Sequence, residues 1–198
     1  MKNEMRASYD AVIRAVHWVT LALIAGLFIL AWAIDELPLE LQSPVLQIHK
    51  SLGITVLGLT IVRLLWRFGA GVPDMPSDLP MLQKLAARIT QYALYALLQI
   101  QPLVGWLWSS AEKNQINYFF LIHVPWLISP DKQLGKTLGH LHGLLGNVLL
   151  GLIGLHAAAA LYHHFVRRDD ILRSMVRGEI RSTGDRTCLP LPDQNVSP

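Results

Sequence analysis

The chain alternates between long apolar runs and short polar stretches. Three runs contain no Asp, Glu, Lys or Arg: residues 15–34, 89–111 and 137–166. A fourth run, at about 44–66, contains only Lys50 near one end and Arg63 near the other, and both side chains can extend to a membrane surface. Each run reaches the roughly 20 residues that a helix needs to cross a bilayer core.

These runs predict an all-α integral membrane protein built as a four-helix bundle, because too little polar sequence is left to cover a soluble core. The predicted spans cover about 15–34, 44–66, 89–111 and 139–165. The membrane domain is placed at residues 1–181, and the polar tail at 182–198 is predicted to be disordered. In the connection at 112–136, the apolar stretch 118–127 is expected to lie at the outer membrane interface or to cap a group buried between the helices.

Basic residues concentrate on one side of the predicted membrane. The N-terminal segment, the second connection and the C-terminal segment hold 13 of the 17 Lys and Arg residues: Lys2, Arg6, Arg14, Arg63, Arg67, Lys84, Arg88, Arg167, Arg168, Arg173, Arg177, Arg181 and Arg186. The positive-inside rule therefore places both termini in the cytoplasm. The net charge of +3 follows from this asymmetry and does not indicate a nucleic-acid partner.

The N-terminal region also has features of a signal peptide, with Ala31-Trp32-Ala33 as a candidate cleavage site. Its apolar run is long for a signal sequence and continues through Trp32 to Ile34. We therefore expect the segment to be retained as the first span.

Four histidines form two pairs, and the two members of each pair lie at the same predicted depth in the membrane. His17 lies near the cytoplasmic end of the first span, and His49 lies near the outer end of the second. The fourth span carries His142 near its outer end and His156 fourteen residues later, about 21 Å further along a helix and on the same face. The predicted pairs are His49 with His142, and His17 with His156.

Paired imidazoles at one depth can bind the iron of a haem from both sides. The four histidines therefore predict two haem groups for electron transfer, because filled axial positions leave no site for oxygen. The single cysteine, Cys188, is expected to be an inert thiol, and no Cys-x-x-Cys-His sequence would attach haem covalently. The haem is therefore expected to be of b type.

Other histidines compete with these four. His163 is seven residues past His156 and on the same face, but it lies beside Arg167 and Arg168, so His163 and His164 are expected at the membrane interface. His140 lies nearly opposite His142 on the helix, and His123 is expected in a loop. Small residues flank the two histidines of the fourth span: Gly143, Gly146, Gly151, Gly154 and Ala157 to Ala160. They either make room for a porphyrin or allow close packing of helices, and both explanations stay open.

The chain resembles the bacterial cytochrome b561 family over about residues 8–177. The matching segments are Ala-Val-His-Trp at 15–18, Gln-Ile-His-Lys-Ser-Leu-Gly at 47–53, Val-Arg-Leu-Leu-Trp-Arg at 62–67, the spacing of His142 and His156, His163-His164-Phe165, and Asp169-Asp170 before Leu172. The resemblance implies a four-helix cytochrome of the bacterial inner membrane with two bis-His haems b. By motif, the implied ligands are His17, His49, His142 and His156.

The resemblance also implies partners, since family members exchange electrons with the quinone pool and some are described as oxidising superoxide. Arg63 lies fourteen residues after His49 and thus near the inner pair, where it is predicted to bind a haem propionate or a quinone carbonyl, or else to extend to the headgroups. Lys50 is predicted to attract an anionic donor such as superoxide, or merely to mark the membrane boundary.

These features leave three functions open. The preferred one is an oxidoreductase of the membrane that uses quinone and a small periplasmic donor. The second is a cytochrome b subunit that serves a larger dehydrogenase or hydrogenase through a partner redox protein. The third is a transporter without haem, whose histidines relay protons.

Overall fold

The structure is a computed structural model that describes residues 10–70, 80–169, 171–176 and 178. This part of the chain contains five α-helices: α1 (Ala11–Ala33), α2 (Leu39–Ala70), α3 (Met81–Ala111), α4 (Lys132–Tyr162) and α5 (Ile171–Val176). A 3-10 turn (Ile34–Glu36) follows α1, and a π-helical turn (His163–Arg167) follows α4. Strands β1 (Asn117–Tyr118) and β2 (Ile122–His123) form an antiparallel hairpin between α3 and α4. The predicted tail at 182–198 and Cys188 lie outside the described residues.

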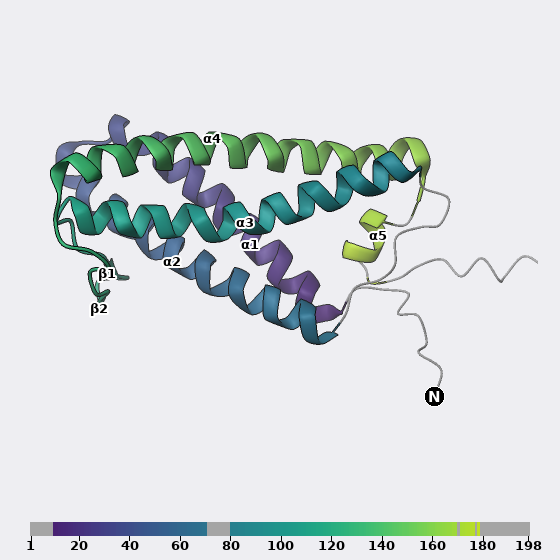
Figure 1. The fold of residues 1–198 in the computed structure, drawn as a ribbon, viewed down its shortest axis with the longest axis horizontal. Helices are drawn as coiled ribbons and strands as arrows, with labels where there is room; N and C mark the ends of the chain where they lie inside the picture. Colours follow the sequence, from purple (N-terminus) through teal and green to yellow (C-terminus); the bar gives the residue numbers. More distant parts are fainter. Residues whose placement is uncertain (1–9, 71–79, 170, 177, 179–198) are drawn as a thin grey trace, which may run out of the picture.

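The four long helices run between the two ends of the molecule, α3 and α4 along its length and α1 and α2 obliquely to them (Figure 1). Helix α1 packs on α2, α2 packs on α3, and α3 packs on α4. The α1–α2 and α3–α4 connections lie at one end, which we call the loop end, and α5 lies toward the other, which we call the α5 end (Figure 1). The loop end corresponds to the side that the sequence analysis assigned as outer.

Local sequence sets where two of the long helices begin. The carboxylate of Asp10 accepts a hydrogen bond of 2.8 Å from the backbone N–H of Val12 at the start of α1. The carboxylate of Asp131 accepts bonds of 2.9 and 3.1 Å from the N–H groups of Gln133 and Leu134 at the start of α4. Both are N-caps, which satisfy backbone donors that the first helical turn leaves unpaired.

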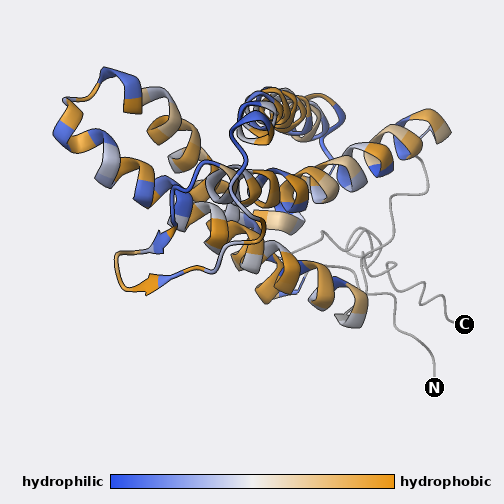
Figure 2. Ribbon diagram, turned by 60° about the vertical axis from the view of Figure 1, so that its left-hand side comes forward, coloured by the Kyte–Doolittle hydropathy of each residue, from blue (hydrophilic) through white to orange (hydrophobic). Residues whose placement is uncertain are grey.

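One residue from each long helix forms the centre of the core. Ile24 of α1, Val56 of α2, Leu98 of α3 and Leu149 of α4 are each at most 8% exposed and contact one another as one group, here called the central cluster. Many other large apolar side chains are exposed. Much of each long helix is correspondingly orange in Figure 2. An apolar exterior of this extent suits lipid rather than water.

Within the described residues, three helical segments are long and apolar enough to cross a membrane: Ala11–Glu36, Leu39–Gly69 and Lys132–Arg167. The predicted third span, 89–111 in α3, is not among them. Its apolar character is diluted by polar residues, including Gln91, Gln99 and Gln101. Membrane crossing by α1, α2 and α4 is thus supported by length and composition, whereas α3 packs in the core through residues that include Leu98 and Val104.

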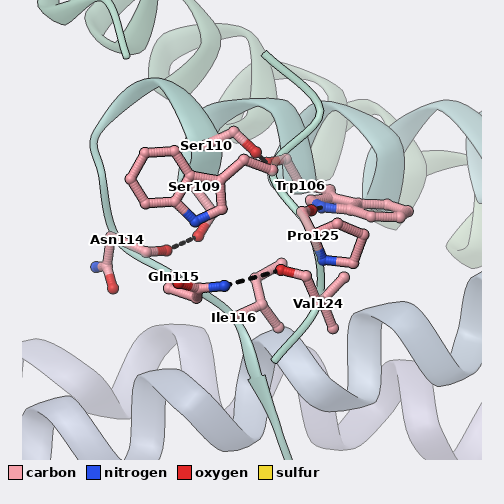
Figure 3. A pocket seen from close by; sticks show the side chains of 9 residues that line it. Trp106, Ser109, Ser110, Asn114, Gln115, Ile116, Val124 and Pro125 are labelled. Carbon is pink, nitrogen blue, oxygen red and sulfur yellow. Dashed lines mark hydrogen bonds between the residues drawn. The ribbon is translucent and has the colours of Figure 1, made fainter. Parts of the chain in front are cut away.

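The connection between α3 and α4 is pinned to the end of α3. The indole N–H of Trp106 donates to the carbonyl of Pro125 at 2.9 Å, and the Gln115 amide donates to the carbonyl of Val124 at 3.2 Å. Figure 3 shows these groups around a hollow whose lining side chains leave no space for the centre of a water molecule. The two arms of the connection therefore pack together as a closed unit.

Candidate functional site

The four histidines that the sequence analysis selected face one another in two pairs. At the loop end, the ring centres of His49 on α2 and His142 on α4 are 6.4 Å apart, with an angle of 70° between the rings. Toward the α5 end, the ring centres of His17 on α1 and His156 on α4 are also 6.4 Å apart, with an angle of 74°. Helix α4 thus contributes one imidazole to each pair.

This separation fits a metal held between the two rings of a pair. A metal–imidazole bond is about 2 Å long and the bonded nitrogen lies about 1 Å from the ring centre, so two axial rings should be about 6 Å apart. The observed 6.4 Å matches this value in both pairs. Two imidazoles suit a metal whose other ligands arrive with it, as in a porphyrin.

The surroundings favour a bound group over a bare ion. No set of three or more His, Cys, Asp or Glu side chains in the described chain could hold a metal ion by itself. The Nδ1 atoms of His49 and His142 are buried, and the two rings lie near the backbone carbonyls of Leu27 and Gln101, respectively. A ligating histidine commonly donates its second ring N–H to a backbone carbonyl, which fixes the orientation of the ring.

Helix α3 supports the pair at the loop end from the side. The Trp108 ring centre lies 5.7 Å from that of His142, and the Gln101 side-chain amide donates to the backbone carbonyl of His142 at 2.9 Å. A Cβ atom added to Gly105 would lie only 2.9 Å from Cε1 of His142, which is shorter than a normal contact. Gly105 therefore makes the space in which the His142 ring lies.

The sequence alone does not reveal this support, because Gln101 and Gly105 lie on a different helix from the histidines. Gln101 and Gly105 are four residues apart on a helix, a spacing that puts both on one face. A polar residue and a glycine on one face of a predicted span were the available signal, but nothing in the sequence linked that face to His142.

Arg63 lies near the pair toward the α5 end, as its spacing from His49 suggested. Its charge is within electrostatic range of both His17 and His156. The guanidinium carbon of Arg63 lies 5.6 Å from the ring centre of Tyr95 on α3, and that of Arg67 lies at the same distance. Tyr95 therefore holds two cationic groups through cation–π contacts.

Lys50 lies at the loop end and contacts the connection between α3 and α4. Its ammonium group donates a hydrogen bond of 3.1 Å to the backbone carbonyl of Asn114. Among the described residues, Lys50 bonds to this carbonyl and forms no ion pair, so no carboxylate of that part of the chain neutralises its charge. The field of this charge reaches the neighbouring pair through His49.

The competing histidines take other positions. His163 lies in the π-helical turn, where its Nδ1 is 2.5 Å from the carboxylate of Asp169, and His164 lies in the same turn. His140 is exposed on α4, and His123 is exposed on strand β2 rather than in an irregular loop. Neither His140 nor His123 belongs to the two pairs.

The small residues of α4 were expected either to make room for a porphyrin or to allow close helix packing. A Cβ at Gly146 would lie 3.2 Å from the Gln101 amide, which indicates close helix packing. At Gly143, Gly151 and Gly154, an added Cβ would meet no atom of the described chain within 4 Å. Helix packing therefore explains Gly146 but not the other three.

The central cluster lies halfway between the two pairs. Ile24 follows His17 by seven residues, and Val56 follows His49 by seven residues. Leu149 lies seven residues from each of the two α4 histidines. The two pairs are thus separated by about 21 Å along α4, with packed apolar side chains between them.

Comparison with known proteins identifies the family to which this arrangement belongs. Residues 8–178 match the family model described as prokaryotic cytochrome b561. The chain is 32% identical to cytochrome b561 homolog 2 of Escherichia coli over 173 residues, which cover 85% of this chain and 90% of that protein.

Two further relatives are similar over comparable lengths. The probable superoxide oxidase CybB of Yersinia pestis is 32% identical over 177 residues, or 87% of this chain and 97% of that protein. Cytochrome b562 of Cereibacter sphaeroides is 28% identical over 176 residues, or 82% and 90% of the two chains. The chain belongs to the prokaryotic cytochrome b561 family of membrane electron-transfer proteins, which carry b-type haem.

Proposed function

We propose that the chain binds two haems b, one between His49 and His142 and one between His17 and His156. The observation that carries this proposal is the equal ring separation of 6.4 Å in the two pairs. Each bound haem would supply a one-electron iron couple. Two imidazoles at each iron would leave no open position for dioxygen, which restricts the chain to electron transfer.

The proposed arrangement in the membrane has four spans, with both termini on the cytoplasmic side of the bacterial inner membrane. The central cluster supports it, because α3 supplies Leu98 on equal terms with the other three helices. Reporter fusions at each end should both give cytoplasmic signals. A periplasmic signal at one end would reduce the number of spans to three.

The proposed reaction is electron transfer from a small periplasmic donor, such as superoxide, to membrane quinone. The name of the Yersinia pestis relative, probable superoxide oxidase, supports this choice of donor. Two superoxide anions would each lose one electron to become dioxygen, and one quinone would take up two electrons and two protons. The chain would then act as an oxidoreductase.

Haem content and turnover test the proposal together. Purified protein should give a b-type reduced-minus-oxidised spectrum and about two haems per chain in a pyridine haemochrome assay. In proteoliposomes that contain quinone, superoxide should be consumed in step with quinol formation. A content of one haem per chain would contradict the proposal that both histidine pairs bind haem. Haem reduction without quinol formation would contradict the proposal that quinone is the electron acceptor.

Arg63→Gln should lower the midpoint potential of one haem by tens of millivolts, where about 59 mV corresponds to a tenfold change for one electron. A cation near His17 and His156 favours the reduced, less positive iron, so its removal favours the oxidised form. Arg67→Gln is the matched control, because Arg67 makes the same 5.6 Å contact with Tyr95. A redox titration checks both variants, and equal shifts would remove any special role for Arg63.

Lys50→Gln should slow haem reduction by superoxide and flatten its dependence on salt. The positive charge of Lys50 beside His49 would attract an anionic donor, and dissolved salt screens such attraction. Stopped-flow reduction at increasing ionic strength measures both effects. Lys84→Gln, which removes the same charge near the start of α3, should behave like the native chain. A native rate independent of salt would show that Lys50 does not steer the donor.

A further inference from the structure

The hairpin between α3 and α4 ends in an exposed apolar tip. Phe120 is 59% exposed, Leu121 is 83% exposed and Ile122 is 64% exposed, and the tip is orange in Figure 2. No Asp, Glu, Lys or Arg occurs anywhere in residues 114–130. A tip of this composition is unfavourable in water.

The hairpin presents this tip at a conformational cost. Phe119 and Phe120 both have positive φ, 46° and 63°, at the two central positions of the turn. Glycine and asparagine usually occupy such positions, because a side chain with a Cβ is strained there. The fold therefore maintains two aromatic residues where small or polar ones would be easier to accommodate.

The backbone of the turn makes its hydrogen bonds within the protein. The N–H of Phe119 donates to Oγ of Ser51 at 2.9 Å, that of Phe120 to the carbonyl of Asn117 at 3.1 Å, and that of Leu121 to the carbonyl of Tyr118 at 3.0 Å. Hydrocarbon offers no hydrogen-bond partners, so backbone polar groups that enter it need partners within the protein. The three N–H groups of this turn meet that condition.

The hairpin is also fastened to the side of α2 rather than above its end. Three side chains of α2 hold the hairpin, and one of them is Ser51, which accepts from Phe119 as described above. The Gln47 side chain accepts a hydrogen bond of 3.0 Å from the N–H of Asn117. The Thr55 hydroxyl shares a hydrogen bond of 3.1 Å with the Tyr118 hydroxyl. Helix α2 has 32 residues, so it is about 48 Å long against a hydrocarbon core of about 30 Å. If α2 is centred in the core, only about its first six residues lie outside it, and all three anchors lie within it.

From these observations we infer that the hairpin tip inserts into the acyl chains of the leaflet at the loop end, as an interfacial anchor beside the spanning helices. The tip continues the apolar exterior of a membrane protein, and the N–H groups of its turn have partners within the protein, as a solvent without hydrogen bonds requires. Insertion would hold the α3–α4 connection against α2 next to His49. The inference does not depend on haem occupancy or on which side of the membrane the loop end faces.

Nitroxide accessibility in membranes tests the insertion. Leu121→Cys in a Cys188→Ser background is labelled and reconstituted in vesicles of phosphatidylethanolamine and phosphatidylglycerol. Its ratio of collision rates with oxygen and with a water-soluble nickel chelate should be severalfold higher than that of Lys132→Cys, an exposed control position at the start of α4. Relaxation of the label by nearby haem is also present without either collision partner, so it is removed when that baseline is subtracted.

A second labelled position and a dilution series distinguish insertion into lipid from exposure to water and from contact with a second copy of the chain. Ile122→Cys should give the same high ratio as Leu121→Cys, which guards against a local effect of one label. Nickel accessibility equal to that of the Lys132 control would place the tip in water and overturn the inference. Dipolar broadening that disappears on dilution with unlabelled protein would overturn it in favour of a second copy of the chain covering the tip.

Discussion

Replacing His142 with alanine is expected to reduce the haem content from about two to about one per chain. The side chain would be one of two axial ligands of the site at the loop end, and alanine cannot coordinate iron. His49 would then be left with an unpaired imidazole in an apolar position. The pyridine haemochrome assay measures the loss, and the spectrum of the remaining haem should be unchanged.

The neighbouring histidines provide matched controls for this result. His140→Ala, two residues away on the exposed side of α4, should retain both haems. His156→Ala should remove the other haem and leave the one held by His49. If His163→Ala removed a haem while His156→Ala did not, the proposed pairing of His17 would be wrong.

Replacing Gly105 with valine is expected to remove most of the haem bound at the loop end without changing any ligand. A single Cβ at this position would already lie 2.9 Å from the His142 ring, and the valine methyl groups extend further. The ring must then move or α3 must separate from α4, and either change breaks the 6.4 Å pairing with His49. Gly105→Ala should cause a smaller loss in the same direction.

Gly58→Ala is the control for glycine replacement in a membrane helix, because an added Cβ there meets no atom of the described chain within 4 Å. It should retain both haems and the native melting temperature. Haem content and thermal unfolding of both variants distinguish displacement of the His142 ring from a general loss of helix stability. A Gly105→Val protein that retains two haems would show that α3 does not confine the His142 ring.

The sequence predicted the long helices from the length of their charge-free runs, and the facing of the histidines from helical periodicity. The charge-free runs within α1 and α4 are long enough to cross a bilayer core. The fourteen-residue spacing of His142 and His156 nearly completes whole turns, so their shared face could be predicted. Residues 89–111 were predicted as a span because they contain no charge, but their glutamines lower the average hydropathy, and α3 is not among the three segments that are apolar enough to cross a membrane. Two of these glutamines, Gln99 and Gln101, hydrogen-bond to α2 and α4.

Features that depend on contacts between distant segments could not be predicted. The role of Gly105 arises because α3 meets α4 at the level of His142, and no local pattern specifies that meeting. The turn at Phe119 and Phe120 has no sequence signal, since its strained backbone is maintained by Ser51, 68 residues earlier. The orientation of the termini and the ligand roles of the histidines stay predictions.

The central cluster has a consequence for membrane permeability. Its four side chains form an apolar layer halfway between the two histidine pairs. Ions cross a layer of hydrocarbon side chains poorly, because transfer of charge out of water is costly. Electrons can tunnel between fixed carriers through such a layer without any ion crossing it. Transfer between the pairs would therefore displace negative charge through the membrane while protons stay on their own side, so each turnover would change the membrane potential without discharging a proton gradient.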